Sequence, residues 1–178
     1  MEQLVEEFGH QTFVSFPVIA ARLLLATIFG AAIGFEREWR DRPAGIRTHI
    51  LVCVAAATFG ILTVEISHAS AFAFETARFD PIRVVEAVTA GVAFLAAGVV
   101  IFTRGEVQGL TTGAGMWLAG AIGISCGLGF WQIALFATVL ALVVLSVLQV
   151  FAIRPASDGD RQRKPKERND PSRGKRSD

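Results

Sequence analysis

The residue types that could do chemistry gather in one short stretch, residues 36–49, which lies between two apolar segments. The stretch mixes arginines with carboxylates and ends in a histidine; its candidate functional residues are Glu36, Arg37, Glu38, Asp41, Arg42, Arg47, Thr48 and His49. Guanidinium groups bind carboxylates and phosphates through paired hydrogen bonds. The stretch could therefore bind lipid headgroups, an anionic ligand or an acidic surface on a partner. Its mixed charge favours an ordered loop with internal ion pairs.

The same stretch offers little for metal or covalent chemistry. His49 and Cys53 are four residues apart and share a helix face, but two ligands do not make a metal site. The carboxylates of the stretch could gather magnesium weakly, and the neighbouring arginines oppose this. The chain has no GxxxxGK and no HExxH, and no serine stands in the strand–turn–helix context of a nucleophile elbow. We therefore expect no enzyme activity, no cofactor and no resident metal ion.

Three further charged residues stand at or inside apolar segments. Arg22 lies well inside one, and an ionisable residue within a membrane is a functional candidate by default. Because Arg22 is about two turns from the end of its segment, snorkelling to the headgroups or pairing with Glu86 is the simpler interpretation. Asp80 precedes Pro81, which is typical of a helix N-cap followed by proline at the first helical position.

The elements that position these residues must be membrane helices. Of the 178 residues, 52% are hydrophobic, and the mean hydropathy is +0.49. Between Val107 and Ile153 there is no Asp, Glu, Lys or Arg. As a single helix this run would extend roughly 70 Å, against about 30 Å for the hydrocarbon core of a bilayer. It must therefore fold back once and supply two spans.

Five membrane spans are predicted, at residues 16–35, 46–66, 82–103, 110–125 and 130–153. Arginines gather between the first two spans, between the third and fourth, and after the fifth. Because basic loops remain in the cytoplasm, the N-terminus is expected outside and the C-terminus inside. The sequence thus predicts an all-α integral membrane protein: an outer segment (1–13), a five-helix domain (14–153) and a disordered basic cytoplasmic tail (154–178).

Small residues recur within the predicted spans. They let helix backbones approach closely in lipid, where packing must replace the hydrophobic driving force. A glycine-lined conduit is the alternative, and the short fourth span is its best location. The helix-packing candidates are Gly30, Gly34, Gly91, Gly98, Gly109, Gly113 and Trp117.

Three blocks of the sequence resemble the MgtC/SapB family. The first is long and specific, and runs from Arg22 through Gly30-Ala31-Ala32-Ile33-Gly34-Phe35-Glu36-Arg37-Glu38-Trp39-Arg40 to Arg42-Pro43-Ala44-Gly45-Ile46-Arg47-Thr48-His49. The second contains Asp80-Pro81-x-Arg83 and residues 91–98, and the third runs from Gly109 through Trp117. The likeness covers about residues 20–150. The resemblance implies a bacterial inner-membrane location and a five-span core, in agreement with the charge pattern.

The resemblance also implies a role. The family is associated with growth at low magnesium and with survival of pathogens inside macrophages, and its best-known members restrain the proton-translocating ATP synthase. A non-enzymatic regulator that binds such a membrane partner is therefore the leading hypothesis. It is expected to be a short form without the family's C-terminal cytoplasmic domain and to bind no nucleic acid. The sequence is compatible with a homo-oligomer and does not fix the oligomeric state. A transporter or channel for magnesium or another small ion is the alternative, and a structural protein that acts through lipid packing is a third.

Overall fold

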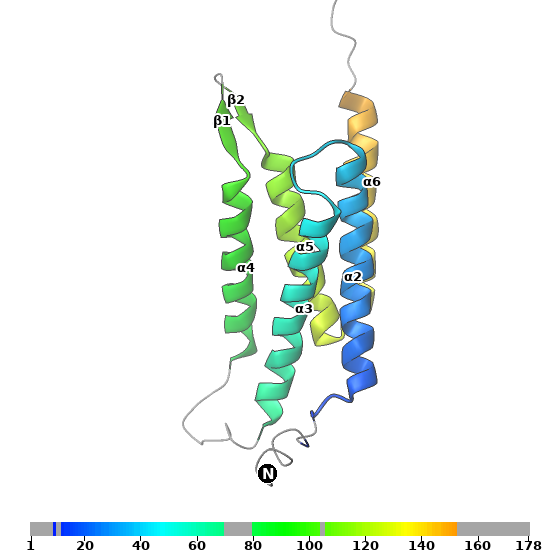
Figure 1. The fold of residues 1–178 in the computed structure, drawn as a ribbon, viewed down its shortest axis with the longest axis vertical. Coiled ribbons are helices and arrows are strands. Elements are labelled where there is room, and N and C mark those ends of the chain that lie inside the picture. Colours follow the sequence, from blue (N-terminus) through cyan, green and yellow to red (C-terminus); the bar gives the residue numbers. More distant parts are fainter. Residues whose placement is uncertain (1–8, 10–11, 70–79, 104–105, 153–178) are drawn as a thin grey trace, which may run out of the picture.

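The computed structural model describes residue 9 and residues 12–69, 80–103 and 106–152. Within this part the chain is mostly helical, and its long helices stand side by side along the longest axis of the molecule (Figure 1). The helices are α2 (Phe16–Trp39), α3 (Ile46–His68), α4 (Pro81–Gly98), α5 (Leu110–Leu128) and α6 (Trp131–Ala152); the strands are β1 (Ile101–Thr103) and β2 (Glu106–Gln108).

Helix ends follow local sequence signals. Proline stands in the first turn of both α2 and α4. The Asp80 side chain caps α4 by accepting a hydrogen bond from the backbone N–H of Ile82 at 3.0 Å. At the end of α5, Gly129 adopts φ +90°, a left-handed conformation that glycine reaches without a Cβ clash.

Helix α2 continues four residues beyond the predicted boundary at residue 35, as far as Trp39. Glu36 and Arg40 are four residues apart on this helix and form an ion pair, which supports the additional turn. The connection to α3 is therefore shorter than the expected loop of residues 36–49. It consists of residues 40–45, so several of the charged candidates lie on helices.

The third predicted span also differs. Helix α4 ends at Gly98, and Ile101–Thr103 pairs with Glu106–Gln108 as an antiparallel hairpin instead of extending the helix to residue 103. The residues before the turn are Val99, Val100, Ile101, Phe102 and Thr103, a β-branched and aromatic run that favours strand over helix. Helix α5, by contrast, runs three residues beyond the predicted limit of 125, because Gly129 and not Cys126 makes the turn.

Helix α5 lies at the centre of the bundle. Its most extensive contact is with α3, α2 also packs closely on α3, and α4 rests mainly on α5. Glycines make these approaches close. A Cβ added to Gly34 would come 2.5 Å from the Cα of Ile46, and one added to Gly123 or Gly127 would collide with a carbonyl oxygen of α3. The helices therefore pack backbone against backbone.

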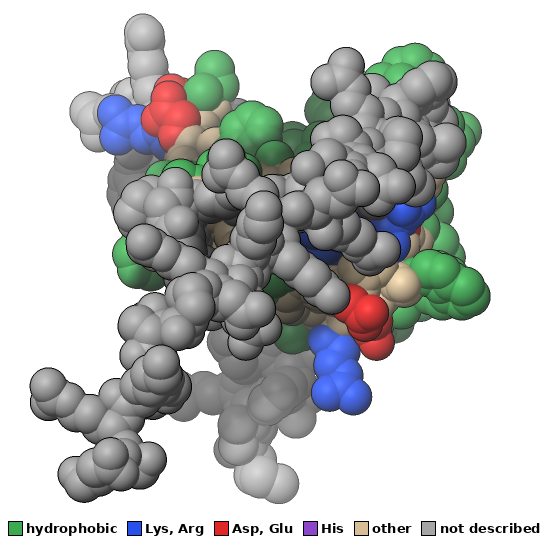
Figure 2. Space-filling model, turned by 90° about the horizontal axis from the view of Figure 1, so that it is seen from above, with side chains coloured by type: hydrophobic (Ala, Val, Ile, Leu, Met, Phe, Trp, Pro, Cys, Tyr) green, Lys and Arg blue, Asp and Glu red, His purple; other side chains and the backbone are tan. Residues whose placement is uncertain are grey.

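The outside of the bundle carries large apolar side chains on all five helices. Exposed examples, one from each, are Leu24, Phe59, Phe94, Leu110 and Phe136. Seen along the bundle from one end, hydrophobic side chains gather at the periphery (Figure 2). By length and composition α2 and α3 could each cross a membrane, and α6 contributes a shorter apolar stretch, Trp131–Ser146. Such an exterior suits lipid better than water.

Candidate functional site

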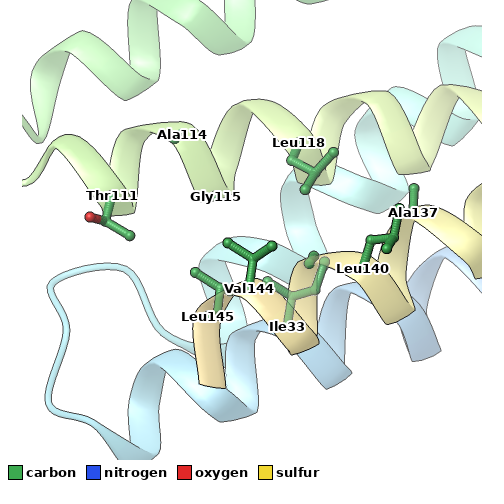
Figure 3. A pocket seen from close by; sticks show the side chains of 10 residues that line it. Ile33, Thr111, Ala114, Gly115, Leu118, Ala137, Leu140, Val144 and Leu145 are labelled. Atoms are coloured by element: carbon green, nitrogen blue, oxygen red, sulfur yellow. The ribbon is translucent and has the colours of Figure 1, made fainter. Parts of the chain in front are cut away.

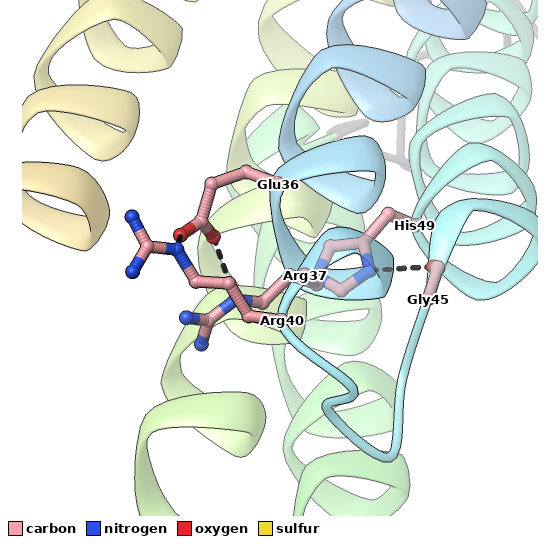
Figure 4. A network of polar contacts seen from close by, with 5 residues as sticks. All are labelled: Glu36, Arg37, Arg40, Gly45 and His49. Atoms are coloured by element: carbon pink, nitrogen blue, oxygen red, sulfur yellow. Dashed lines mark hydrogen bonds and ion pairs between the residues drawn. The ribbon is translucent and has the colours of Figure 1, made fainter.

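A charged cluster occupies the end of α2. The Glu36 carboxylate lies between two guanidinium groups, as Figure 4 shows. One of its oxygens accepts a hydrogen bond from Nε of Arg37 at 2.9 Å, and the other pairs with Nε of Arg40 at 2.6 Å. The side chain of Arg37 is 0% exposed, that of Glu36 10% and that of Arg40 33%. The cluster therefore runs from a buried arginine to one at the surface.

The buried member of the cluster lacks part of its hydrogen bonding. Both terminal nitrogens of the Arg37 guanidinium are buried and have no hydrogen-bond partner in the structure. Buried donors are normally satisfied, and a buried guanidinium without full pairing is costly. Arg37 therefore depends strongly on Glu36, its one carboxylate partner among the described residues.

His49 lies beside this cluster on the first turns of α3 (Figure 4) and is completely buried. Its Nδ1 lies 2.9 Å from the carbonyl oxygen of Gly45, so Nδ1 carries the donated hydrogen. Its Nε2 is buried without a partner and faces α5, 3.5 Å from where a Cβ on Gly115 would stand. A larger residue at position 115 would therefore press on the imidazole.

The histidine and cysteine that share a face of α3 do not point to one ligand. The Cys53 thiol donates to the carbonyl oxygen of Ala119 at 3.1 Å, whereas His49 Nδ1 is bonded to Gly45. In the described part of the chain, no group of three or more His, Cys, Asp or Glu residues is arranged to hold a metal ion.

Glu38 joins α2 to the start of α3. Its carboxylate accepts a hydrogen bond from the backbone N–H of Ile46 at 2.9 Å, and thus caps a helix that has no side-chain cap from its own N-cap residue, Gly45. In the connecting loop Asp41 adopts φ +50°. Of the remaining candidates in this region, Arg42 and Arg47 are exposed and Thr48 is half-buried.

Arg22 caps the far end of α5 and does not pair with Glu86. Its guanidinium donates to the carbonyl oxygen of Gly127 at 2.8 Å and lies against Gly129. Glu86 is exposed on α4. A cation at a helix C-terminus satisfies open carbonyl groups and complements the helix dipole. The arginine inside the span therefore fastens α2 to α5.

We expect Arg22→Gln to lower the free energy of unfolding by about 2 kcal/mol, because a charged hydrogen bond to a helix terminus is lost. Thermal unfolding in detergent, followed by a thiol-reactive dye, measures this, since Cys53 and Cys126 are both buried. Arg83→Gln, which removes an exposed arginine from α4, is the matched control. Equal unfolding temperatures for the two variants would show that the cap contributes nothing.

The packing candidates divide into two groups. Gly30 and Gly34 lie directly against the backbone of α3, and Gly113 contacts the backbone of α4 at Ala96. Gly109 has φ +87° and stands against the Val99 carbonyl, where the hairpin rejoins the bundle. By contrast, a Cβ added to Gly91 or Gly98 would meet no atom within 4 Å, and Trp117 is half exposed between α4 and α5.

Two structural features lie outside the predicted site and packing residues. Glu65, near the end of α3, accepts hydrogen bonds from the backbone N–H groups of Phe13 and Val14 at 2.7 and 2.9 Å, and so anchors the chain that enters α2. Gly123 and Gly127 make the closest contacts between α3 and α5. Their four-residue spacing was a usable signal, since it repeats the pattern of Gly30 and Gly34.

The structure contains two sizeable apolar pockets. One, of about 390 Å³, lies among α2, α5 and α6, with Thr111 as the polar residue in its lining (Figure 3). The other, of about 550 Å³, lies between α3 and α4, with Arg83 near its outer end. Their volumes are within the range of ligand sites, but their linings offer few polar groups to fix the orientation of a ligand.

Apolar helices with a lipid-compatible exterior and a charged cluster at one end define a helical membrane protein. The chain belongs to the MgtC family, whose family model matches residues 23–153.

Three relatives illustrate the match. The chain is 35% identical over 133 residues to the putative magnesium transporter YhiD of Escherichia coli K12. The aligned residues make up 75% of this chain and 61% of the relative. It is 38% identical over 144 residues to protein MgtC of Salmonella typhimurium LT2, covering 81% and 58%. An uncharacterized Synechocystis protein, slr0014, is 36% identical over 136 residues, covering 76% and 52%.

The chain thus spans between 52% and 61% of the length of these relatives. No solved structure matches it.

Proposed function

We propose that this protein is a non-enzymatic regulator in the bacterial inner membrane that acts by binding another membrane protein, such as the ATP synthase. The observation that carries the proposal is a contrast between two parts of the bundle. The interior has few buried polar groups, whereas one face of α4, at Gly91 and Gly98, is open. The charged cluster at the end of α2 provides a second contact region for the partner.

The proposal includes five membrane spans, with the N-terminus outside. Exposed apolar side chains on all five helices support this arrangement, as does the alternation of arginine-rich and arginine-poor connections. Helix α4 is the shortest, yet its 18 residues extend about 27 Å, close to the thickness of the hydrocarbon core.

The interior of the bundle favours a regulator over a conduit. In the described part of the chain, the buried polar residues are Arg37, His49, Thr63, Thr112 and Thr138. The hydroxyl groups of Thr63 and Thr138 donate to carbonyl oxygens of their own helices. An ion path needs polar groups in succession across the membrane, and these residues do not supply one.

The open face of α4 favours a protein partner. Gly91 and Gly98 are seven residues apart on the helix, and neither is covered by another part of the chain. Gly91 lines the 550 Å³ groove between α3 and α4. Small residues on an uncovered membrane helix permit close approach of a second helix.

A small-ion transporter is the alternative, and the name of one relative favours it: YhiD is called a putative magnesium transporter. The glycine-rich helix α5, which begins at Leu110 and carries Thr111 and Thr112 in its first turn, would be the place for a path. In that case several chains, or a different conformation, would have to supply the missing polar groups.

The test is ATP-driven proton pumping in inverted membrane vesicles with and without the protein, with ATP hydrolysis followed in parallel. A regulator of the synthase lowers pumping and hydrolysis together. A fall in pumping while hydrolysis holds or rises would indicate ion conduction and support the alternative. No change in either would exclude the synthase as the partner.

A matched pair of variants localises the contact. Gly91→Leu adds bulk to the open face of α4 and should abolish the effect on pumping, because the Cβ position of Gly91 is open, with no atom within 4 Å. Ala93→Leu adds similar bulk at an exposed position on the opposite side of α4 and should leave the effect intact. Equal activity of the two variants would remove this face from the proposal.

A further inference from the structure

A groove of about 450 Å³ lies between α2 and α6, next to the charged cluster. Its lining comes from two helices that run in the same direction (Figure 1). Four residues belong to its polar half, namely Glu36, Trp39, Arg40 and Ser146; three belong to its apolar half, namely Ala32, Phe35 and Leu142.

The lining residues of both helices change from apolar to polar in the same direction along this groove. On α2 the lining passes from Ala32 and Phe35 to Glu36 and Arg40, and on α6 it passes from Leu142 to Ser146, one turn later. An amphiphile with an apolar chain and a polar head would match both halves at once. The pocket among α2, α5 and α6 has no charged residue in its lining. The pocket between α3 and α4 has one, Arg83, without an acidic partner beside it in the lining.

The position of the groove along the bundle matches that of a membrane lipid. Trp39 is 79% exposed at the polar end, and tryptophan concentrates at the level of lipid headgroups. The apolar end lies deeper along α2, toward the centre of the bundle. A molecule with its head at Trp39 would thus lie in the orientation of a membrane phospholipid.

The charge of the polar end favours an anionic head. The Glu36 carboxylate is shared between two guanidinium groups, and the terminal nitrogens of the inner one, Arg37, are buried and unpartnered. A phosphate at the rim, beside Arg40, would lie one helical turn from Arg37 and lower the cost of its buried positive charge. Arginine is also the residue that best matches the geometry of phosphate.

We propose that the groove between α2 and α6 is a binding site for one anionic phospholipid. An acyl chain lies along Ala32, Phe35 and Leu142, and the phosphate lies beside Arg40 at the rim. The site is separate from the open face of α4, and it shares Glu36 and Arg40 with the charged cluster at the end of α2.

Native mass spectrometry of the full chain tests the proposal, with phosphatidylglycerol, phosphatidylcholine and inorganic phosphate as probes. One phosphatidylglycerol should bind, about fivefold more tightly than phosphatidylcholine, since one basic residue near an anionic lipid contributes about that factor. Arg40→Gln should remove this preference. Leu142→Trp, which fills the apolar half, should reduce binding of both lipids.

Two control variants separate the site from general effects. Arg47→Gln removes an exposed arginine at the same end of the bundle, and Val143→Trp adds bulk on an exposed face of α6 outside the groove. Both should bind phosphatidylglycerol like the wild type. Unchanged binding in Arg40→Gln and Leu142→Trp, or full competition by inorganic phosphate, would overturn the proposal. Thermal unfolding of each variant confirms that it is folded.

Discussion

Gly123→Ala should lower the free energy of unfolding by about 3 kcal/mol, the upper part of the usual range for overpacking. The added Cβ would collide with the carbonyl oxygen and Cα of Cys53 on α3. Backbone atoms cannot rotate away as a side chain can, so α3 and α5 must separate along their closest contact. The exposure of the two buried cysteines on heating, followed with a thiol-reactive dye, measures the loss.

Gly91→Ala is the matched control, since its added Cβ meets no atom within 4 Å. It should leave stability unchanged or raise it by up to about 1 kcal/mol, because alanine is the better helix former. If Gly123→Ala unfolded at the same temperature as Gly91→Ala, the tight approach of α3 and α5 would not exist in the folded protein.

Glu36→Gln is expected to destabilise the protein by about 3–5 kcal/mol. The substitution removes the carboxylate that pairs with the completely buried Arg37, and breaking a buried pair from one side leaves an uncompensated charge. The same thiol-exposure assay measures the effect. Glu86→Gln, at an exposed position of α4, should change little.

The double variant Glu36→Gln/Arg37→Met distinguishes a charge effect from a general loss of packing. Because a buried ion pair can often be replaced by apolar residues at little cost, most of the lost stability should return. Failure of the second substitution to restore any stability would mean that the carboxylate acts through its shape or through Arg40, and not by balancing Arg37.

The helices were predictable from the sequence because long charge-free runs leave no other structure for a chain in lipid. Predicted starts at residues 16, 46 and 110 coincide with those of α2, α3 and α5. The hairpin at residues 101–108 was not foreseen. Mean hydropathy does not distinguish an apolar strand from an apolar helix. The signal for the strand was the β-branched run from Val99 to Thr103, which mean hydropathy does not register.

The site could be predicted in composition but not in detail. Mixed charge in residues 36–49 indicated internal ion pairs, and the Glu36 pairs are of that kind. Partners were harder to assign, because sequence spacing reports only neighbours on one helix. Arg22 binds a carbonyl 105 residues away. Glycine spacing likewise cannot tell a covered face, as at Gly34, from an open one, as at Gly98.

The attachment of α4 has a mechanical consequence. Helices α2, α3 and α5 are held backbone to backbone, whereas α4 rests mainly on α5 and continues into the β1–β2 hairpin, which extends beyond the adjacent ends of α4 and α5 (Figure 1). The hairpin is thus attached to a helix at the edge of the bundle. A load on it tilts α4 before it strains the stiff three-helix body, because fewer contacts must yield.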